Sequence, residues 1–159
     1  MSVMVRKPVS EAVAVQRLEA LCARSERASG ELRRKLQTWG IPAVVAEKIL
    51  DDLRRRRFLD DGRFARSFVH DKLMYDRWGR IKIRMYLKQK QVPSEEIDAA
   101  LSDIDMETYV GILDRLLRAK ARTLSADLEP RLRREKIARF GIARGFEPQL
   151  VFKALRELT

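Results

Sequence analysis

ELRRKLQTWGIPAVVAEKILDDL, residues 31–53, recurs farther along the chain as KIRMYLKQKQVPSEEIDAALSDI, residues 82–104. The two stretches align without a gap, with residue 31 on residue 82. Apolar and proline positions coincide along the whole alignment: Leu32 with Ile83, Leu36 with Leu87, Ile41 with Val92, Pro42 with Pro93, Leu50 with Leu101, and Leu53 with Ile104. A third copy, KIARFGIARGFEPQLVFKALREL at 136–158, aligns more loosely. A segment that recurs three times predicts a tandem-repeat fold.

Each copy has the features of two helices joined by a tight turn. Gly40 and Gly145 suit the left-handed residue that follows a helix, and Pro42 and Pro93 suit a first helical turn. Another segment with apolar residues at helical spacing precedes each copy, and these segments cover 13–24, 63–77 and 108–122. We therefore predict an all-α fold of three tandem three-helix repeats. The expected ranges are a flexible N-terminus at 1–10 and repeats at 11–59, 60–106 and 107–159.

Composition restricts the class of function. The chain has 159 residues, with 34 Lys and Arg against 23 Asp and Glu, and its formal net charge of +11 favours a polyanionic partner. One Cys and one His cannot form an internal disulfide or a zinc cluster. The short motifs of phosphate-binding loops, serine hydrolases and zinc peptidases do not occur. We expect a protein that is not an enzyme and has no cofactor.

The sequence also indicates where the protein resides. No apolar run approaches membrane-spanning length, and the first ten residues, MSVMVRKPVS, lack the apolar core of a signal peptide. We therefore expect a cytoplasmic protein with no membrane partner. No heptad pattern or large apolar surplus requires a dimer, so we expect a monomer.

Four consecutive arginines lie between two Asp pairs in DDLRRRRFLDD, residues 51–61. Arg54, Arg55, Arg56 and Arg57 fall at the C-terminal end of a predicted helix, where cations are stabilised by the helix dipole. Four arginines exceed what one helix end needs, so an added phosphate contact is an open alternative.

Two further basic tracts are candidates for a polyanion contact. The tract from Arg77 to Ser94 contains six bases and no acid, and the second tract follows residue 130. Spacings of three, four and four residues predict a stripe on one helix face for part of the first tract. The predicted contact residues are Arg77, Arg80, Arg84 and Lys88 in the first tract, and Arg131, Arg133 and Arg134 in the second. For any one of these side chains, solvation of a helix surface is the alternative interpretation. Nearby aromatic residues, Trp39, Tyr75 and Trp78, either stack on bases or form the edge of the core.

Four groups of residues resemble the RecX family of recombinase regulators, in the family's order and spacing and over nearly the whole chain after residue 10. The matching residues are Arg24, Ser25, Glu31, Leu32, Lys35 and Leu36; Leu59, Asp60, Asp61, Phe64 and Ala65; Gly79, Ile83, Leu87, Lys90 and Val92; and Arg144, Gly145 and Phe146. Two positions depart from the family pattern: Gln91 stands where Gly is frequent, which affects a helix end, and Tyr86 stands where an acidic residue is common.

The resemblance implies a fold and a function. The implied fold is an elongated, curved array of three three-helix units, in agreement with the repeats. The implied function is a regulator that lies in the groove of the RecA filament on single-stranded DNA and inhibits or modulates its ATPase and strand-exchange activities. The alternative is a general nucleic-acid-binding helical protein that competes for DNA, for which the basic tracts alone suffice.

Overall fold

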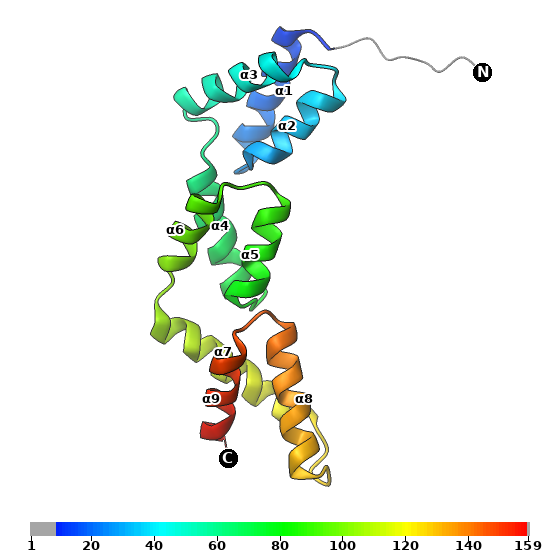
Figure 1. Cartoon of the computed structure of the whole chain (residues 1–159), viewed down its shortest axis with the longest axis vertical. Helices are drawn as coiled ribbons and strands as arrows, with labels where there is room; N and C mark the ends of the chain where they lie inside the picture. The colour runs from blue at the N-terminus through cyan, green and yellow to red at the C-terminus, as the bar shows by residue number, and fades with distance from the viewer. Residues whose placement is uncertain (1–8, 159) are drawn as a thin grey trace, which may run out of the picture.

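A computed structural model describes residues 9–158, and these fold into nine helices without a strand (Figure 1). The all-α prediction is therefore confirmed for the described part of the chain. The helices are α1 Glu11–Arg24, α2 Ser29–Thr38, α3 Ala43–Arg55, α4 Asp61–Met74, α5 Arg80–Gln89, α6 Ser94–Ser102, α7 Met106–Thr123, α8 Pro130–Ala143 and α9 Pro148–Leu158.

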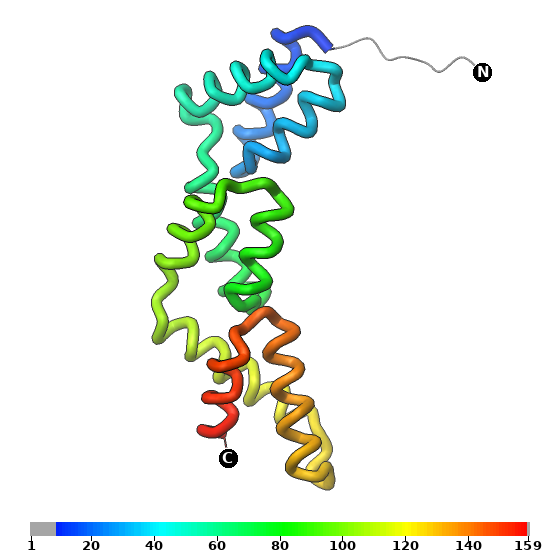
Figure 2. The backbone as a smooth tube through the Cα atoms, in the orientation of Figure 1, coloured from blue at the N-terminus to red at the C-terminus, as the bar shows by residue number. Residues whose placement is uncertain are grey.

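The helices are grouped in three units of three that follow one another along the long axis of the molecule (Figure 1). Unit 1 contains α1 to α3, unit 2 contains α4 to α6, and unit 3 contains α7 to α9. The backbone trace is elongated and slightly bowed, because the middle unit lies to one side of the line that joins the other two (Figure 2). The predicted three-helix repeats are thus present as a linear array.

The unit limits differ slightly from the predicted ranges. Residues 1–8 of the predicted flexible N-terminus lie outside the described residues. Val9 and Ser10 belong to the fold, because the Val9 amide donates to the Trp39 carbonyl at 2.9 Å and the Ser10 hydroxyl caps α1 by accepting from the Val13 amide. Met106, which the predicted ranges assign to the second repeat, is the first residue of α7.

The predicted helix ends are present. Gly40 and Gly145 have φ of 79° and 97°, the left-handed conformation that ends α2 and α8. Gln91, which replaces the family's usual Gly, adopts the same conformation with φ of 59°, and the Val92 amide then donates to the Leu87 carbonyl at 3.1 Å. The helix end is therefore kept, although a residue with a Cβ pays a conformational cost in this region.

Two hydrophobic clusters form the core. The first lies within unit 1 and includes Leu18, Leu36 and Leu50. The second runs through units 2 and 3 without a break, from Ala65 to Leu155, and also includes Ala28, which precedes α2 in unit 1. Units 2 and 3 thus share one core, whereas unit 1 has its own.

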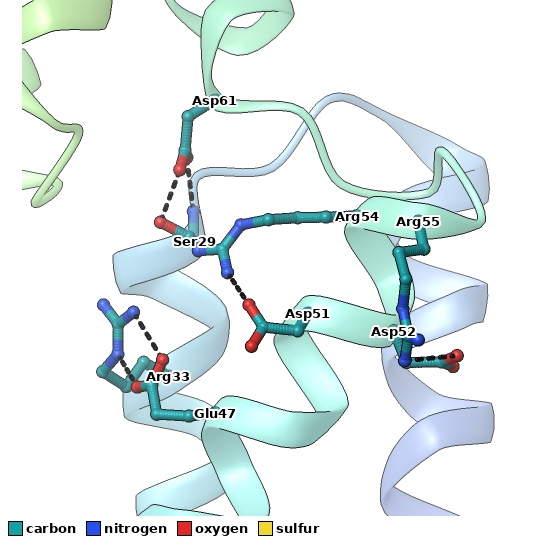
Figure 3. Close-up of polar contacts among 8 residues, drawn as sticks. All are labelled: Ser29, Arg33, Glu47, Asp51, Asp52, Arg54, Arg55 and Asp61. Atoms are coloured by element: carbon teal, nitrogen blue, oxygen red, sulfur yellow. Dashed lines mark hydrogen bonds and ion pairs between the residues drawn. The ribbon is translucent and has the colours of Figure 1, made fainter.

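Unit 1 contacts unit 2 through the start of α2. Asp61, the first residue of α4, accepts from the Ser29 amide at 2.8 Å and from the Ser29 hydroxyl at 2.7 Å (Figure 3). Gly30 lies directly against Lys90 and Gln91, because a Cβ on Gly30 would stand 2.5 Å from the Lys90 carbonyl oxygen. The first turn of α2 is therefore seated on the end of α5.

Unit 2 contacts unit 3 in the corresponding way. The amides of Gly79 and Ile81, at the start of α5, donate to the carbonyls of Arg144 and Gly145, at the end of α8, at 2.8 and 3.0 Å. The amide of Arg80 donates to the Tyr109 hydroxyl at 2.9 Å. Second helices therefore follow one another head to tail, and the positive end of each helix dipole meets the negative end of the next (Figure 1).

Candidate polyanion interface

The basic side chains of α5 lie on two flanks of the helix, separated by the buried residues Ile83 and Leu87. Arg80, Arg84 and Lys88 recur every four residues on the flank that faces α6. Lys82, Tyr86 and Lys90 recur at the same spacing on the flank that faces α4. The two flanks differ in their partners, and this difference decides which cations are available to a ligand.

Arg80 belongs to the junction between units 2 and 3. Its Nε donates to Glu147 Oε1 at 2.8 Å, and its guanidinium lies 4.6 Å from the centroid of the Tyr109 ring. The hydrogen bond with Glu147 raises the pKa of Arg80. Tyr109 is fully buried, and its hydroxyl donates to Glu147 Oε2 at 2.9 Å. Arg80 therefore holds the junction together, which the spacing of basic residues did not indicate.

The other three residues of the predicted stripe have different environments. Arg84 pairs with Asp98 of α6 at 2.5 Å. Arg77 lies in the connection between α4 and α5 and has φ of 55°, so it does not continue the helical stripe. Arg77 and Lys88 are exposed, and neither forms an ion pair within residues 9–158. The structure therefore divides the stripe into two paired arginines and two available cations.

The four consecutive arginines lie at the end of α3, as predicted. Three of them pair locally: Arg54 with Asp51 at 2.7 Å, Arg55 with Asp52 at 3.7 Å, and Arg56 with Asp52 and Glu19 at 2.9 Å each (Figure 3 draws the first two). Arg57 has φ of 62° and forms no ion pair in the part of the chain that the structure describes. Most of this arginine run is thus used at the helix end, and Arg57 remains available.

The second tract lies at the start of α8. Arg133 donates to the Ala121 carbonyl at the end of α7 at 2.8 Å and to the Ser125 carbonyl in the following loop at 3.4 Å, so it satisfies backbone acceptors there. Arg131 lies 3.5 Å from Glu135 and is highly exposed, a geometry in which an ion pair contributes little. Arg134 is exposed and has no acidic partner among the described residues.

A cluster of cations and aromatic rings occupies the α4-facing flank of α5. Lys82 Nζ lies 4.4 Å from the centroid of the Trp78 ring, and Lys72 Nζ of α4 lies 4.7 Å from the same ring. The Tyr86 ring is 4.6 Å from Trp78. Lys90 Nζ lies 6.0 Å from the Phe68 ring. A cation beside a ring is attracted by the ring quadrupole, so the rings hold these ammonium groups in place.

The cation–aromatic pairing recurs in every unit between its first and second helices. In unit 1, Arg17 of α1 lies 5.2 Å from the ring of Trp39, which caps α2. In unit 3, Lys120 of α7 lies 5.1 Å from the ring of Phe140 of α8. The cation–aromatic flank is the name used below for these pairings: Arg17 with Trp39 in unit 1, Lys72 and Lys82 with Trp78 in unit 2, and Lys120 with Phe140 in unit 3. Each unit thus has a cation beside an aromatic ring, but at a different repeat position, because Trp39 and Phe140 align with Lys90 and Tyr86 of unit 2 and not with Trp78.

Lys82 and Lys90 belong to the basic tract but are not among the contact residues predicted from its spacing. A signal was present, since Phe64, Phe68 and Lys72 are spaced by four residues in one helix. The partner across the helix pair is fixed only by packing, so the pairing with Trp78 required the structure. Trp78 is half-buried, and two lysines lie against its ring. Its burial agrees with a place at the edge of the core, and the two lysines beside it agree with a contact to nucleic acid.

The described residues show neither a metal centre nor a membrane span. No group of three or more His, Cys, Asp and Glu side chains within residues 9–158 could hold a metal ion. None of the described helices is long and apolar enough to cross a membrane. The fold and the charge define the class of the protein as a basic, all-α tandem-repeat array.

Comparison with known proteins identifies the family. Residues 14–53 match the first three-helix domain of RecX, and residues 60–101 match the second. These ranges correspond to units 1 and 2 and cover more than half of the chain. The chain belongs to the RecX family of regulatory proteins, and it is a non-enzymatic regulator.

Similar proteins and structures extend the match to unit 3. The chain is 33% identical over 133 residues to the regulatory protein RecX of Prosthecochloris aestuarii, which is 84% of this chain and 85% of that one. It is 35% identical over 140 residues to RecX of Leptothrix cholodnii, which is 87% and 84% of the two chains. The crystal structure of RecX from Lactobacillus salivarius has a TM-score of 0.86 over 93% of this chain and 96% of that chain, at 20% identity, and so supports the fold alone.

Proposed function

We propose that this protein binds the RecA filament on single-stranded DNA, along the filament groove, and inhibits or modulates its ATPase and strand-exchange activities. Membership of the RecX family supports RecA as the partner. The observation that carries the proposal is the cation–aromatic flank, which has at least one cation beside a ring in each unit of an elongated array.

The mechanism follows from the linear shape. An array with three similar units contacts several neighbouring protomers of a filament at once, and linked weak contacts gain affinity through effective concentration. A molecule that bridges protomers favours the filament state in which all its contacts are made. It therefore opposes the rearrangements that nucleotide turnover and filament growth require, without any chemistry of its own.

The partners of each cation support a choice of contact residues. Lys72, Lys82 and Lys90 of unit 2 are held by aromatic rings, and of the three only Lys72 also pairs with an acid, Asp76 at 3.1 Å. From the sequence-derived set, we retain Arg57, Arg77, Lys88, Arg131 and Arg134 as additional contacts. Arg54, Arg56, Arg80, Arg84 and Arg133 contribute to the fold through the contacts described above, whereas the exposed pair of Arg55 at 3.7 Å contributes little and leaves Arg55 available. Binding through ammonium and guanidinium groups makes occupancy sensitive to salt.

A pair of charge-matched variants tests the proposed contact. Lys72→Gln with Lys82→Gln removes two cations of the flank. Lys48→Gln with Lys153→Gln removes two exposed cations of α3 and α9, at equivalent positions of units 1 and 3. Binding is measured by co-sedimentation with RecA filaments assembled on single-stranded DNA, and by fluorescence anisotropy with the DNA alone, each over a range of salt concentrations.

We expect the flank variant to bind the filament about tenfold more weakly than the control variant, which corresponds to about 1.4 kcal/mol. On free DNA, each lost phosphate contact lowers the slope of log affinity against log salt by about 0.7. Equal losses in the two variants would show that only net charge matters. That result would favour the general nucleic-acid-binding function over a filament-specific one.

A further inference from the structure

An ion pair joins the second and third helices of units 1 and 2 at the same repeat position. In unit 1, Arg33 Nε donates to Glu47 Oε1 at 2.6 Å (Figure 3). In unit 2, Arg84 Nη1 donates to Asp98 Oδ1 at 2.5 Å. The alignment of residue 31 with residue 82 places Arg33 on Arg84 and Glu47 on Asp98. Each pair bridges the groove between its two helices.

Unit 3 lacks this ion pair, because apolar residues occupy both positions. The alignment of residue 136 with residue 31 places Ala138 on Arg33 and Phe152 on Glu47. A groove of about 650 Å³ lies between α8 and α9 at this point. Its apolar lining is formed by Ala138, Ile142, Phe152 and Leu155. The second unit's corresponding groove, of about 420 Å³, contains the Arg84–Asp98 pair in its wall.

The groove of unit 3 combines exposed apolar surface with positive charge. Phe152 and Ile142 are 49% and 39% exposed, whereas Ala138 and Leu155 form a buried floor. Arg131, Arg134 and Arg139 surround it together with a single acid, Glu135. Arg134 and Arg139 form no ion pair within residues 9–158. A volume of this size accommodates a large apolar side chain and its flanking backbone.

We propose that the α8–α9 groove of unit 3 is a docking site for a short acidic segment of a protein partner. The segment inserts one apolar side chain between Ala138 and Phe152, and its carboxylates face Arg134 and Arg139. The charge of the rim selects an acidic partner, and the apolar floor selects a protein segment over a phosphate backbone, which has no apolar side chain to bury. This site differs from the cation–aromatic flank, although its rim shares Arg131 and Arg134 with the additional contacts proposed above, and the groove variants leave both arginines in place.

The internal repeat indicates a variant that should fill the groove and keep the fold, because units 1 and 2 have charged residues at the same positions. Ala138→Arg together with Phe152→Glu introduces the ion pair that units 1 and 2 carry at these positions. The net charge is unchanged, so long-range attraction of polyanions is preserved. A second pair of variants is independent of that design: Ile142→Ser lies in the groove, and Val110→Ser, at 38% exposure on α7, is a control of matched exposure outside it.

The probe is a fluorescein-labelled peptide of aspartates and glutamates with one central leucine, and binding is followed by anisotropy. A peptide with serine in place of leucine and a single-stranded oligonucleotide serve as comparisons. We expect Ala138→Arg/Phe152→Glu and Ile142→Ser to weaken binding of the leucine peptide about tenfold or more, which is about 1.4 kcal/mol. We expect Val110→Ser to bind as the unsubstituted chain does, and the oligonucleotide affinity to be unchanged in all variants.

Three results would overturn the proposal. Equal affinity of the unsubstituted chain for the leucine and serine peptides would show that no apolar side chain is inserted. Unchanged peptide affinity in both groove variants would place binding elsewhere on the basic surface. Loss of oligonucleotide binding in the groove variants, in parallel with the peptide, would assign the groove to nucleic acid. Circular dichroism of each variant establishes that the helices are retained.

Discussion

Single residues set the ends of these helices and satisfy the polar groups between units. Gln91 adopts a left-handed conformation that glycine adopts at lower cost, and it does so where α5 meets Gly30 of α2. Tyr109 accepts from an amide at the start of α5 and donates to Glu147. The sequence predicted the glycine helix ends at positions 40 and 145, because glycine marks them. It did not predict the role of Tyr109, whose partners lie 29 and 38 residues away along the chain.

Gln91→Gly is expected to stabilise the protein by about 1 kcal/mol, because it relieves the left-handed conformation of a residue that carries a Cβ. Gln89→Gly, in the last turn of α5, is the matched control and should cost about 0.5 kcal/mol. Urea denaturation of the two variants provides both free energies of unfolding. Destabilisation by both substitutions would mean that the Gln91 side chain contributes more through contact than its backbone costs.

Tyr109 should make the free energy of unfolding depend on pH in the alkaline range. Burial is the largest cause that raises the pKa of its phenol in the folded state. An unfolded tyrosine titrates near pH 10, so above that pH the unfolded chain releases a proton that the folded chain retains. Stability from this group is complete below about pH 10 and falls as the pH rises further.

Tyr109→Phe removes this dependence and also leaves the Arg80 amide and Glu147 without their shared partner. We expect a loss of about 1–3 kcal/mol at neutral pH, with a smaller further loss above pH 10 than in the unsubstituted protein. Thermal unfolding between neutral pH and pH 11 measures both effects. Parallel pH curves for the two proteins would contradict the assignment.

At the scale of elements, the second helices of successive units are joined end to end, and this geometry explains part of the basic stripe. Arg80 and Arg84 were predicted as contacts from their spacing, yet they pair with Glu147 and Asp98. Spacing along one helix reveals which residues share a face but not which acids a neighbouring helix brings to it. The Arg84–Asp98 pair had a signal in the repeat, because Arg33 and Glu47 stand at the same positions. Glu147 had no comparable signal.

The junction of α5 with α8 depends on close contact between backbones. A Cβ on Gly79 would lie 2.3 Å from the Gly145 carbonyl carbon and oxygen, which are backbone atoms and cannot rotate away. We expect Gly79→Ala to cost about 1–3 kcal/mol through this overlap. Gly111→Ala, in the interior of α7, is the control: an added Cβ would lie 3.9 Å from the Arg115 side chain, so the substitution should stabilise the protein by about 1 kcal/mol.

Chemical denaturation compares the two glycine variants directly. If Gly79→Ala left the free energy of unfolding unchanged, the two helix ends would be able to separate at little cost. The units would then be joined mainly by side chains, and the head-to-tail contact would contribute little to the rigidity of the array.

At the scale of the whole molecule, the array is divided unequally. Units 2 and 3 share a continuous core, while unit 1 is joined to them mainly through polar contacts, including Ser29 with Asp61, Arg63 with Glu26, and Arg34 with the Gln89 carbonyl. The repeated sequence predicted three units of similar kind. The sequence did not predict that the contacts between units differ. The repeat predicts the helices within each unit, but it contains no information on which residues of one unit contact the next.

Equivalent core substitutions should reveal this division. Leu36 and Leu87 occupy the same repeat position and are both fully buried. Leu36→Ala should lower hydrogen-exchange protection in α1 to α3 alone, whereas Leu87→Ala should lower it in both units 2 and 3, each at a cost of about 2–5 kcal/mol. Loss of protection across all nine helices in both variants would show one cooperative core instead of two.

The central claim, that the filament and not free DNA is the target, is tested most directly by the single-stranded-DNA-dependent ATPase rate of RecA. The protein is titrated well below the RecA concentration, and the titration is repeated with excess free single-stranded DNA. We predict inhibition at substoichiometric amounts that persists with the added DNA, because a bridging array acts on assembled protomers. Inhibition that disappears with added DNA, or no inhibition, would contradict the claim and favour competition for DNA.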